Sequence, residues 1–169
     1  MVMILGIDPG LSGGLCLYDG SPTPYVIPMP ILETKKGNEV DWDYLSDQFD
    51  LVLKVAAHAY VEDVHSMPKE GVSSAFKFGG AVIGVWAMCA AFKIPRTRVS
   101  PGVWQPPMIG LGGKKSVTTK DKSVARALEL FPSMRNSFVG PRGGKIDGNA
   151  DAAMIAVYGY HIHTGRRFK

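Results

Sequence analysis

Cysteine is scarce in this sequence, and both of its cysteines lie in apolar segments. Cys16 falls in an expected strand and Cys89 in an expected helix. Isolated thiols in such surroundings favour inert packing residues over a disulfide or a metal-binding pair. They also fit a reducing compartment, where disulfides are rare.

Long hydrophobic runs are also missing. The apolar stretch over 81–92 is too short and too rich in small residues to suggest a membrane span. The sequence starts directly with an expected core strand, which leaves no room for a signal or transit peptide. We therefore expect a cytoplasmic protein, or one made in the cytoplasm of a bacterial host, with no membrane partner.

The chain has the size and composition of one ordinary domain, which we expect over residues 1–169. Hydrophobic residues make up 46% of the sequence and charged residues 20%, which predicts a globular fold with its own core. Lys and Arg together number 19 against 15 Asp and Glu, a net charge of +4. This excess favours a polyanionic partner without establishing one.

The first stretch of the chain predicts a hairpin with an acid at its turn. An almost unbroken apolar run over 2–7 suits a strand buried on both faces, and Asp8 ends it. Small residues follow, and 14–18 is expected to return as the second strand. A metal ion with a bound phosphate would fit beside such a carboxylate. An Asp that merely begins a turn explains Asp8 equally well at this point.

The rest of the chain alternates strands, helices and polar loops. Asp41 is expected to cap the first helix, because apolar residues follow it at helical spacing. Three consecutive strands at the start suggest an antiparallel meander. The other expected elements are a third strand over 23–29, a solvated loop over 31–40, a strand over 59–61, a helix over 73–92, a strand over 96–100, a loop over 106–119, a helix capped by Thr119, a polar loop over 133–145 and a final helix over 150–162.

Three further acids stand in positions comparable to that of Asp8. Glu62 follows the strand over 59–61, and Asp147 and Asp151 lie one helical turn apart where the final helix begins. Each alone is explained by an ordinary strand exit or helix cap. Together, however, carboxylates repel unless cations neutralise them. They predict Mg²⁺ or Mn²⁺, and two such ions about 4 Å apart can promote phosphodiester cleavage.

Basic residues gather in the second half of the chain. The Gly- and Lys-rich loop over 106–119 could cradle phosphate, but it lacks the Gly-Lys-Thr or Gly-Lys-Ser order of a P-loop. A loop that contacts the DNA backbone fits better. Lys120, Lys122 and Arg126 form a basic side of the next helix, although most such faces are simply solvated.

The helix over 73–92 is apolar around most of its circumference and is interrupted by Gly79, Gly80 and Gly84. Each glycine costs about 1 kcal/mol of helix propensity relative to Ala, so a close approach of another element is expected there. A homodimer interface and a central helix covered by its own domain both satisfy this pattern.

An ordered series of motifs covers nearly the whole chain. They are GIDPGLSGG, VEDVH, SSAFKFGG, VSPGVWQ, KDKSVARALELFP and DGNADAAMIA. In this order they resemble the RuvC-type Holliday junction resolvases, most closely the phage and organellar branch. The resemblance implies an α/β fold of the RNase H-like superfamily, with a five-stranded mixed sheet, its first three strands antiparallel, and helices on both faces.

The resemblance also implies roles for particular residues. The expected catalytic residues are Asp8, Glu62, Asp147, Asp151, Lys120 and Lys122, of which the four acids would bind two Mg²⁺ (or Mn²⁺) ions. The residues expected to contact DNA are His65, Lys77, Trp104, Gln105, Lys114, Lys115 and Arg142. His65 stands where bacterial members have an aromatic residue that stacks at the junction centre. Bacterial members usually space the last two acids three apart, whereas Asp147 and Asp151 are four apart.

The expected function is a metal-dependent, structure-selective endonuclease. It would act as a homodimer on four-way DNA junctions, by paired symmetric nicks that leave 5′-phosphate and 3′-hydroxyl ends, without a nucleotide cofactor. Other branched DNA or RNA is an alternative substrate, and a non-catalytic junction-binding protein is an alternative role. An actin or sugar-kinase type ATPase shares the first hairpin but needs a second lobe that 169 residues do not supply.

Overall fold

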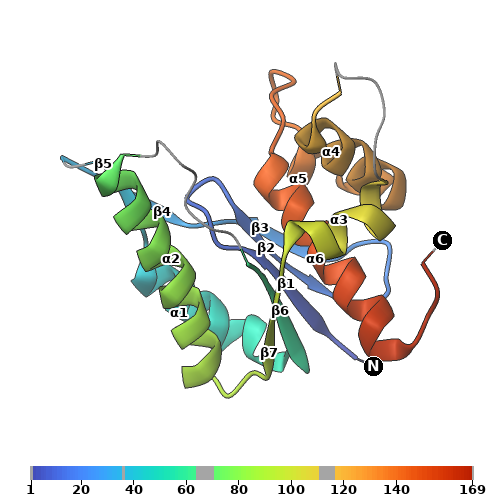
Figure 1. The fold of residues 1–169 in the computed structure, drawn as a ribbon, viewed down its shortest axis with the longest axis horizontal. Coiled ribbons are helices and arrows are strands. Elements are labelled where there is room, and N and C mark those ends of the chain that lie inside the picture. Colours follow the sequence, from blue (N-terminus) through green and yellow to red (C-terminus); the bar gives the residue numbers. More distant parts are fainter. Residues whose placement is uncertain (1, 36, 64–70, 111–116, 169) are drawn as a thin grey trace.

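The structure, a computed structural model, describes residues 2–35, 37–63, 71–110 and 117–168. At its centre lies a five-stranded sheet in the order β3-β2-β1-β6-β7 (Figure 1). Its strands are β1 (Ile4–Asp8), β2 (Gly14–Tyr18), β3 (Tyr25–Pro28), β6 (His58–Glu62) and β7 (Arg96–Val99).

Strand direction divides this sheet into two halves. β1, β2 and β3 pair antiparallel, as the three consecutive strands predicted, while β6 and β7 run parallel to β1. The carboxyl ends of the three parallel strands therefore lie at one edge. The predicted mixed sheet with an antiparallel beginning is confirmed.

Helices cover both faces of the sheet (Figure 1). On one side lie α1 (Trp42–Leu51) and α2 (Val72–Ala91). On the other side lie α3 (Pro101–Ile109), α4 (Thr119–Leu130), α5 (Arg135–Phe138) and α6 (Asp147–Thr164). Short 3-10 turns occupy Leu53–Val55 and Pro132–Met134.

Alternate residues of β1 enter two separate cores. Leu5 and Ile7 join the cluster under α1 and α2, whereas Ile4 joins the cluster formed with α3, α4 and α6. Gly6 lies directly against α6, where a Cβ would come within 2.3 Å of the Ala152 carbonyl oxygen. Since both faces are buried, the apolar run is nearly unbroken, as predicted.

Three predicted loops contain regular structure, and the one predicted over 133–145 includes α5. The predicted loop over 31–40 is a hairpin of β4 (Ile31–Thr34) and β5 (Gly37–Val40), whose residues are exposed except for Val40. A polar exposed hairpin shows no alternation of apolar residues, so its pattern resembles a loop. The predicted loop from Pro106 onward is also wrong at its start, because α3 continues to Ile109 and ends at Gly110, whose φ is 71°.

Helix boundaries follow their capping residues. Asp41 caps α1 as predicted, accepting the Tyr44 backbone N–H at 2.9 Å. Thr118, rather than Thr119, caps α4, in a capping box with Asp121. The final helix begins at Asp147, three residues earlier than predicted.

Much of α2 is exposed, so of the two alternatives the helix enclosed by its own domain is wrong. Its Phe76 is 82% exposed and its Ile83 58%. By length and composition alone α2 could also cross a membrane. Its most apolar 18-residue stretch has a mean hydropathy of 1.4, and only 17% of that stretch is buried. One such helix is weak evidence for a span. Cys16 and Cys89 are buried free thiols, as predicted.

Candidate active site

Three of the four predicted acids gather at the edge where the parallel strands end. Asp8 is the last residue of β1, Glu62 is the last residue of β6, and these two strands are parallel neighbours. Asp151 lies in the first turns of α6, the helix that packs on β1 and β2. Asp147, the fourth acid, is the first residue of the same helix.

Glycines allow the start of α6 to lie on the turn between β1 and β2. A Cβ on Gly148 would come within 2.0 Å of the Ser12 carbonyl oxygen, and one on Gly14 within 2.6 Å of Asn149 Oδ1. Only residues without side chains permit this contact. The glycine between the two aspartates therefore seats the helix against the turn that follows Asp8.

Burial raises the pKa of three of these carboxyl groups. The pKa rises to about 6 for Asp8, to about 8 for Glu62 and to about 7 for Asp151, in each case mainly because burial disfavours the charged form. The Gly10 N–H, donated to Asp8 Oδ1 at 3.2 Å, opposes the rise at Asp8. Asp8 therefore begins a turn, which is the alternative to a metal site. Only its Oδ1 takes part in the turn, by accepting the Gly10 N–H.

The acids also act on one another. The charge of Asp8 raises the pKa of both Glu62 and Asp151, and that of Asp147 raises the pKa of Asp8 and Asp151. Among the residues that the structure describes, Oδ1 of Asp151 is buried without a hydrogen-bond partner, while the Ser123 side chain opposes the rise in the pKa of this group. An unpartnered carboxylate oxygen beside other acids is an arrangement that a cation would stabilise.

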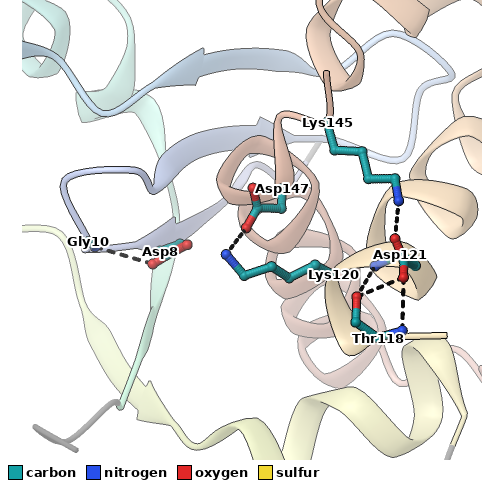
Figure 2. Close-up of polar contacts among 7 residues, drawn as sticks. All are labelled: Asp8, Gly10, Thr118, Lys120, Asp121, Lys145 and Asp147. Atoms are coloured by element: carbon teal, nitrogen blue, oxygen red, sulfur yellow. Dashed lines mark hydrogen bonds and ion pairs between the residues drawn. The ribbon is translucent and has the colours of Figure 1, made fainter. Parts of the chain in front are cut away.

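Lys120 supplies a positive charge to this group. Its Nζ lies 2.5 Å from Asp147 Oδ2, and Figure 2 shows it reaching from α4 toward Asp147, with Asp8 beside its ammonium group. The hydrogen bond to Asp147 is the main reason that the pKa of Lys120 is raised, and the charges of Asp151 and Asp8 add to the effect. Of the two lysines predicted to serve the site, Lys120 is thus the one beside the acids.

Lys122 has a different position. It lines a hollow between α3 and α4 together with Pro107 and Met108. None of the four acids lines that hollow.

A hard divalent cation fits the chemistry of these residues. Within the described residues, no three acidic, histidine or cysteine side chains are placed closely enough to hold a metal ion between them. Nevertheless the donors are all carboxylate oxygens, Glu62 is buried, Asp8 and Asp151 are partly buried, and among the described residues one oxygen of Asp151 is unpartnered. Oxygen donors of this kind are those that Mg²⁺ and Mn²⁺ prefer.

Trp104 was predicted to contact DNA, and the structure contradicts this. Its side chain is completely buried, and its Nε1–H donates a hydrogen bond to Glu62 Oε1 at 2.9 Å. A side chain enclosed in the core cannot lie against nucleic acid in this conformation. Sequence reasoning missed the contact with Glu62, because nothing in the spacing of two residues 42 positions apart indicates that they meet.

The other residues predicted to contact DNA are spread over several elements. Lys77 of α2 lies 3.3 Å from the Asn38 carbonyl oxygen of β5, and Gln105 is partly exposed on α3. Arg142 is exposed in the loop before α6. His65, Lys114 and Lys115 lie outside the described residues. The contacts of all these residues with DNA stay predictions.

A second polar cluster, also missed from the sequence, lies beside Lys120. Asp121 accepts the Thr118 backbone N–H at 2.9 Å and pairs with Lys145, as Figure 2 shows. The Lys145 contact is the first cause that lowers the pKa of Asp121 to about 2. This pairing joins the loop before α6 to the start of α4. The Thr-x-x-Asp spacing of the cap was a readable signal.

One cavity lies away from these acids. A cavity of about 530 Å³ lies between α3, α4, α6 and the C-terminal segment, with Met108, Arg126, Val157 and Phe168 among the residues that line it. None of the four acids lines this cavity. The candidate site is therefore identified by its charge and burial.

The order and direction of the strands, with helices on both faces, define an RNase H-like fold. No protein-family model and no curated protein matches the sequence. Among solved structures, the chain is similar to Thermus thermophilus RuvC in complex with a Holliday junction substrate, with a TM-score of 0.62 at 15% identity. It is also similar to another structure of RuvC from the same organism, with a TM-score of 0.61 at 16% identity.

Both comparisons cover 98% of this chain and 98% of the RuvC chain. Over 98% of its length the chain therefore has the fold of RuvC. The predicted resemblance to these proteins is confirmed at the level of the fold.

Proposed function

We propose that this protein is a metal-dependent endonuclease that resolves four-way DNA junctions by paired symmetric nicks, leaving 5′-phosphate and 3′-hydroxyl ends. The observation that carries the proposal is the gathering of Asp8, Glu62 and Asp151 at one edge of a RuvC-like sheet, with Glu62 buried and the two aspartates partly buried. Carboxyl groups that raise one another's pKa destabilise a fold, so a catalytic use explains their position better than a structural one.

The four acids would hold the metal ions. Asp8 and Glu62 offer oxygens from strand ends, while Asp147 and Asp151 offer them from the first turns of α6. The positive end of the α6 dipole adds a favourable field for charged carboxylates. When bound, two Mg²⁺ or Mn²⁺ ions activate water and stabilise the leaving oxygen of a phosphodiester.

Lys120 would contact the phosphate that is cleaved. Its ammonium group already lies among the acids, paired with Asp147, and its side chain is 67% exposed. An exposed, flexible lysine can exchange one anionic partner for another at small cost. Lys120 would thus pass from Asp147 to the phosphate when DNA and metal enter.

Branched DNA is the partner that fits this site best. The RuvC structure with a Holliday junction substrate shares this fold over 98% of both chains. The net charge of +4 agrees with a polyanionic partner. Lys77, Lys114, Lys115 and Arg142 are the cations that we assign to phosphate contacts, with Gln105 and His65 as polar and stacking contacts.

A homodimer would supply the second active site that symmetric nicks require. The uncovered face of α2, formed by Val72, Phe76 and Ile83 with exposed fractions of 88%, 82% and 58%, is the surface that we assign to the dimer. A hollow of about 700 Å³ beside Gly79 and Gly80 continues this face. Glycines there have nothing within 4 Å of an added Cβ, so another helix can approach closely.

The first test is the cleavage of a synthetic mobile four-way junction in the presence of Mg²⁺. Wild type should give paired symmetric nicks, and Asp8→Asn and Asp151→Asn should abolish them while junction binding persists. Asp47→Asn, at an exposed position on α1, is the matched control and should cleave like wild type.

Comparison of substrates separates the alternatives. Equal cleavage rates on junctions, forks and RNA–DNA hybrids would contradict junction selectivity and favour a broader nuclease. Tight junction binding without any nick, in Mg²⁺ and in Mn²⁺, would contradict the catalytic proposal and favour a junction-binding accessory protein.

A further inference from the structure

Trp104 and Glu62 come from neighbouring elements at the acidic edge of the sheet. Glu62 ends β6 and pairs in register with Val99, the last residue of β7. After Ser100, α3 begins at Pro101, so Trp104 lies in its first turns. Because this connection is short, the indole ring of Trp104 lies beside Glu62, the residue that pairs with Val99.

Both groups are enclosed. Trp104 has no exposed surface and Glu62 is only 7% exposed, and 2.9 Å separates the indole Nε1 from Oε1 of the carboxyl group. Among the described residues, no other hydrogen bond to the Glu62 side chain is present. One oxygen of Glu62 is therefore engaged by Trp104, while Oε2 has no hydrogen-bond partner there.

The ring that makes this hydrogen bond cannot turn freely. Trp104 belongs to the core cluster formed by α3, α4 and α6, with Val99, Val124 and Met154 among its members. Close packing of this kind holds a large side chain in one rotamer. The direction of the N–H donor, and with it the orientation of the carboxyl group, is fixed by the core.

We propose that Trp104 is a positioning residue that orients Glu62 as a metal ligand, engaging Oε1 so that Oε2 is left for the cation. This inference rests on the proposed function. A residue that only filled space in this core could be Phe or Leu, with no polar atom to satisfy. An N–H aimed at a ligand acid is the arrangement by which outer groups orient metal ligands in proteins.

Metal affinity is the direct test, because it can be measured without turnover. We expect Trp104→Phe, which keeps an aromatic ring and removes the donor, to weaken Mn²⁺ binding about 10- to 100-fold, measured by calorimetry or by the free-ion signal in electron paramagnetic resonance. Trp86→Phe is the matched control, since Trp86 packs under Arg96 and Arg98 away from the acids, and it should bind Mn²⁺ like wild type.

A structural role alone predicts a different result. If Trp104 only fills the core, Trp104→Phe should lower the melting temperature but leave Mn²⁺ affinity within about twofold of wild type, and that result would overturn the inference. Junction binding in Ca²⁺, which should persist in both variants, shows that each retains its fold. If wild type itself binds no Mn²⁺, the proposed function fails, which is a separate outcome.

A measurement on the unaltered Trp104 covers the case in which Trp104→Phe does not fold. Spectra of Trp42→Phe and Trp86→Phe assign the indole N–H signal of Trp104 by elimination. We expect this N–H to exchange slowly with solvent and its resonance to move during Mg²⁺ titration, with the midpoint of metal binding. A signal that exchanges fast, or stays fixed while metal binds, would contradict the role.

Discussion

Asp8, Glu62 and Asp151 make the folded chain sensitive to pH when no metal is bound. In an unfolded chain such carboxyl groups ionise near pH 4, whereas in the fold their pKa values are about 6, 8 and 7. Between these limits the folded state binds more protons than the unfolded state. The free energy of unfolding should therefore fall as pH rises from about 4 to about 8.

We expect this fall to be on the order of a few kcal/mol in chelator-treated protein, measured by urea unfolding at several pH values. Asp151→Asn should flatten the dependence, because it removes one group with a raised pKa and also removes a charge that raises the pKa of Glu62. Asp47→Asn should leave it unchanged. Added Mg²⁺ should restore stability at pH 8. Stability that stays level or rises over this range would contradict the burial of these charges.

Lys120 offers a second prediction for single residues. Lys120→Met removes the ammonium group that lies 2.5 Å from Asp147 while keeping an unbranched side chain. We expect junction cleavage in Mg²⁺ to fall at least about tenfold, because a charge that stabilises the phosphate is lost. Lys122→Met, on the same helix but beside Pro107 and Met108, should cleave within about threefold of wild type. Equal losses in the two variants would contradict the separate roles.

Acids were easier to predict than their partners. Asp8, Glu62 and Asp151 could be found because each follows a readable strand end or helix start, and strand ends of a parallel sheet share an edge. The hydrogen bond from Trp104 to Glu62 could not, because it depends on how α3 packs after β7. An aromatic residue beside prolines looks the same in sequence whether it is buried or faces DNA.

At the scale of elements, the seating of α6 on the turn after β1 decides where two acids lie. Gly148→Ala would place a methyl group within 2.0 Å of the Ser12 carbonyl oxygen and 2.5 Å of Gly13 Cα, and backbone atoms cannot give way locally. We expect a loss of about 1–3 kcal/mol or more in the free energy of unfolding. Junction cleavage should fall as well, since Asp147 and Asp151 move with the helix.

Gly102→Ala is the control for this substitution. An added Cβ on Gly102, in α3, meets nothing within 4 Å, so the helix should be unchanged or up to about 1 kcal/mol more stable. Thermal and urea unfolding measure both variants. If Gly148→Ala unfolds like wild type, α6 does not lie against the turn in the way described.

Elements whose apolar residues keep a regular period were predicted, whereas α3, α5 and the exposed hairpin of β4 and β5 were not. β1, β2 and α1 came close to their predicted bounds because the core imposes a period on their apolar residues. The hairpin of β4 and β5 has almost no buried residue, so its sequence lacks that period. Pro106 and Pro107 suggested a loop. They lie instead in the last part of α3, which begins at Pro101.

At the scale of the whole molecule, the exposed apolar face of α2 has no explanation within a single chain. Its apolar residues extend around the helix, which the sequence revealed, but no pattern within one chain tells what covers them. A second copy would bury Phe76 and Ile83 and bring two active sites into one particle. Paired symmetric nicks depend on that arrangement, so oligomeric state and the pattern of nicks should change together.

Ile83→Asp should therefore convert a dimer into a folded monomer. A charge at a buried apolar contact opposes association, whereas at a site 58% exposed in the single chain it costs little stability. Light scattering should report half the mass of wild type, and junctions should receive single rather than paired nicks. Leu51→Asp, on α1 at a position 72% exposed, is the control and should remain dimeric. A wild type that is monomeric at the concentrations that give paired nicks, or an Ile83→Asp variant that stays dimeric, would contradict the assignment of α2 to the dimer interface.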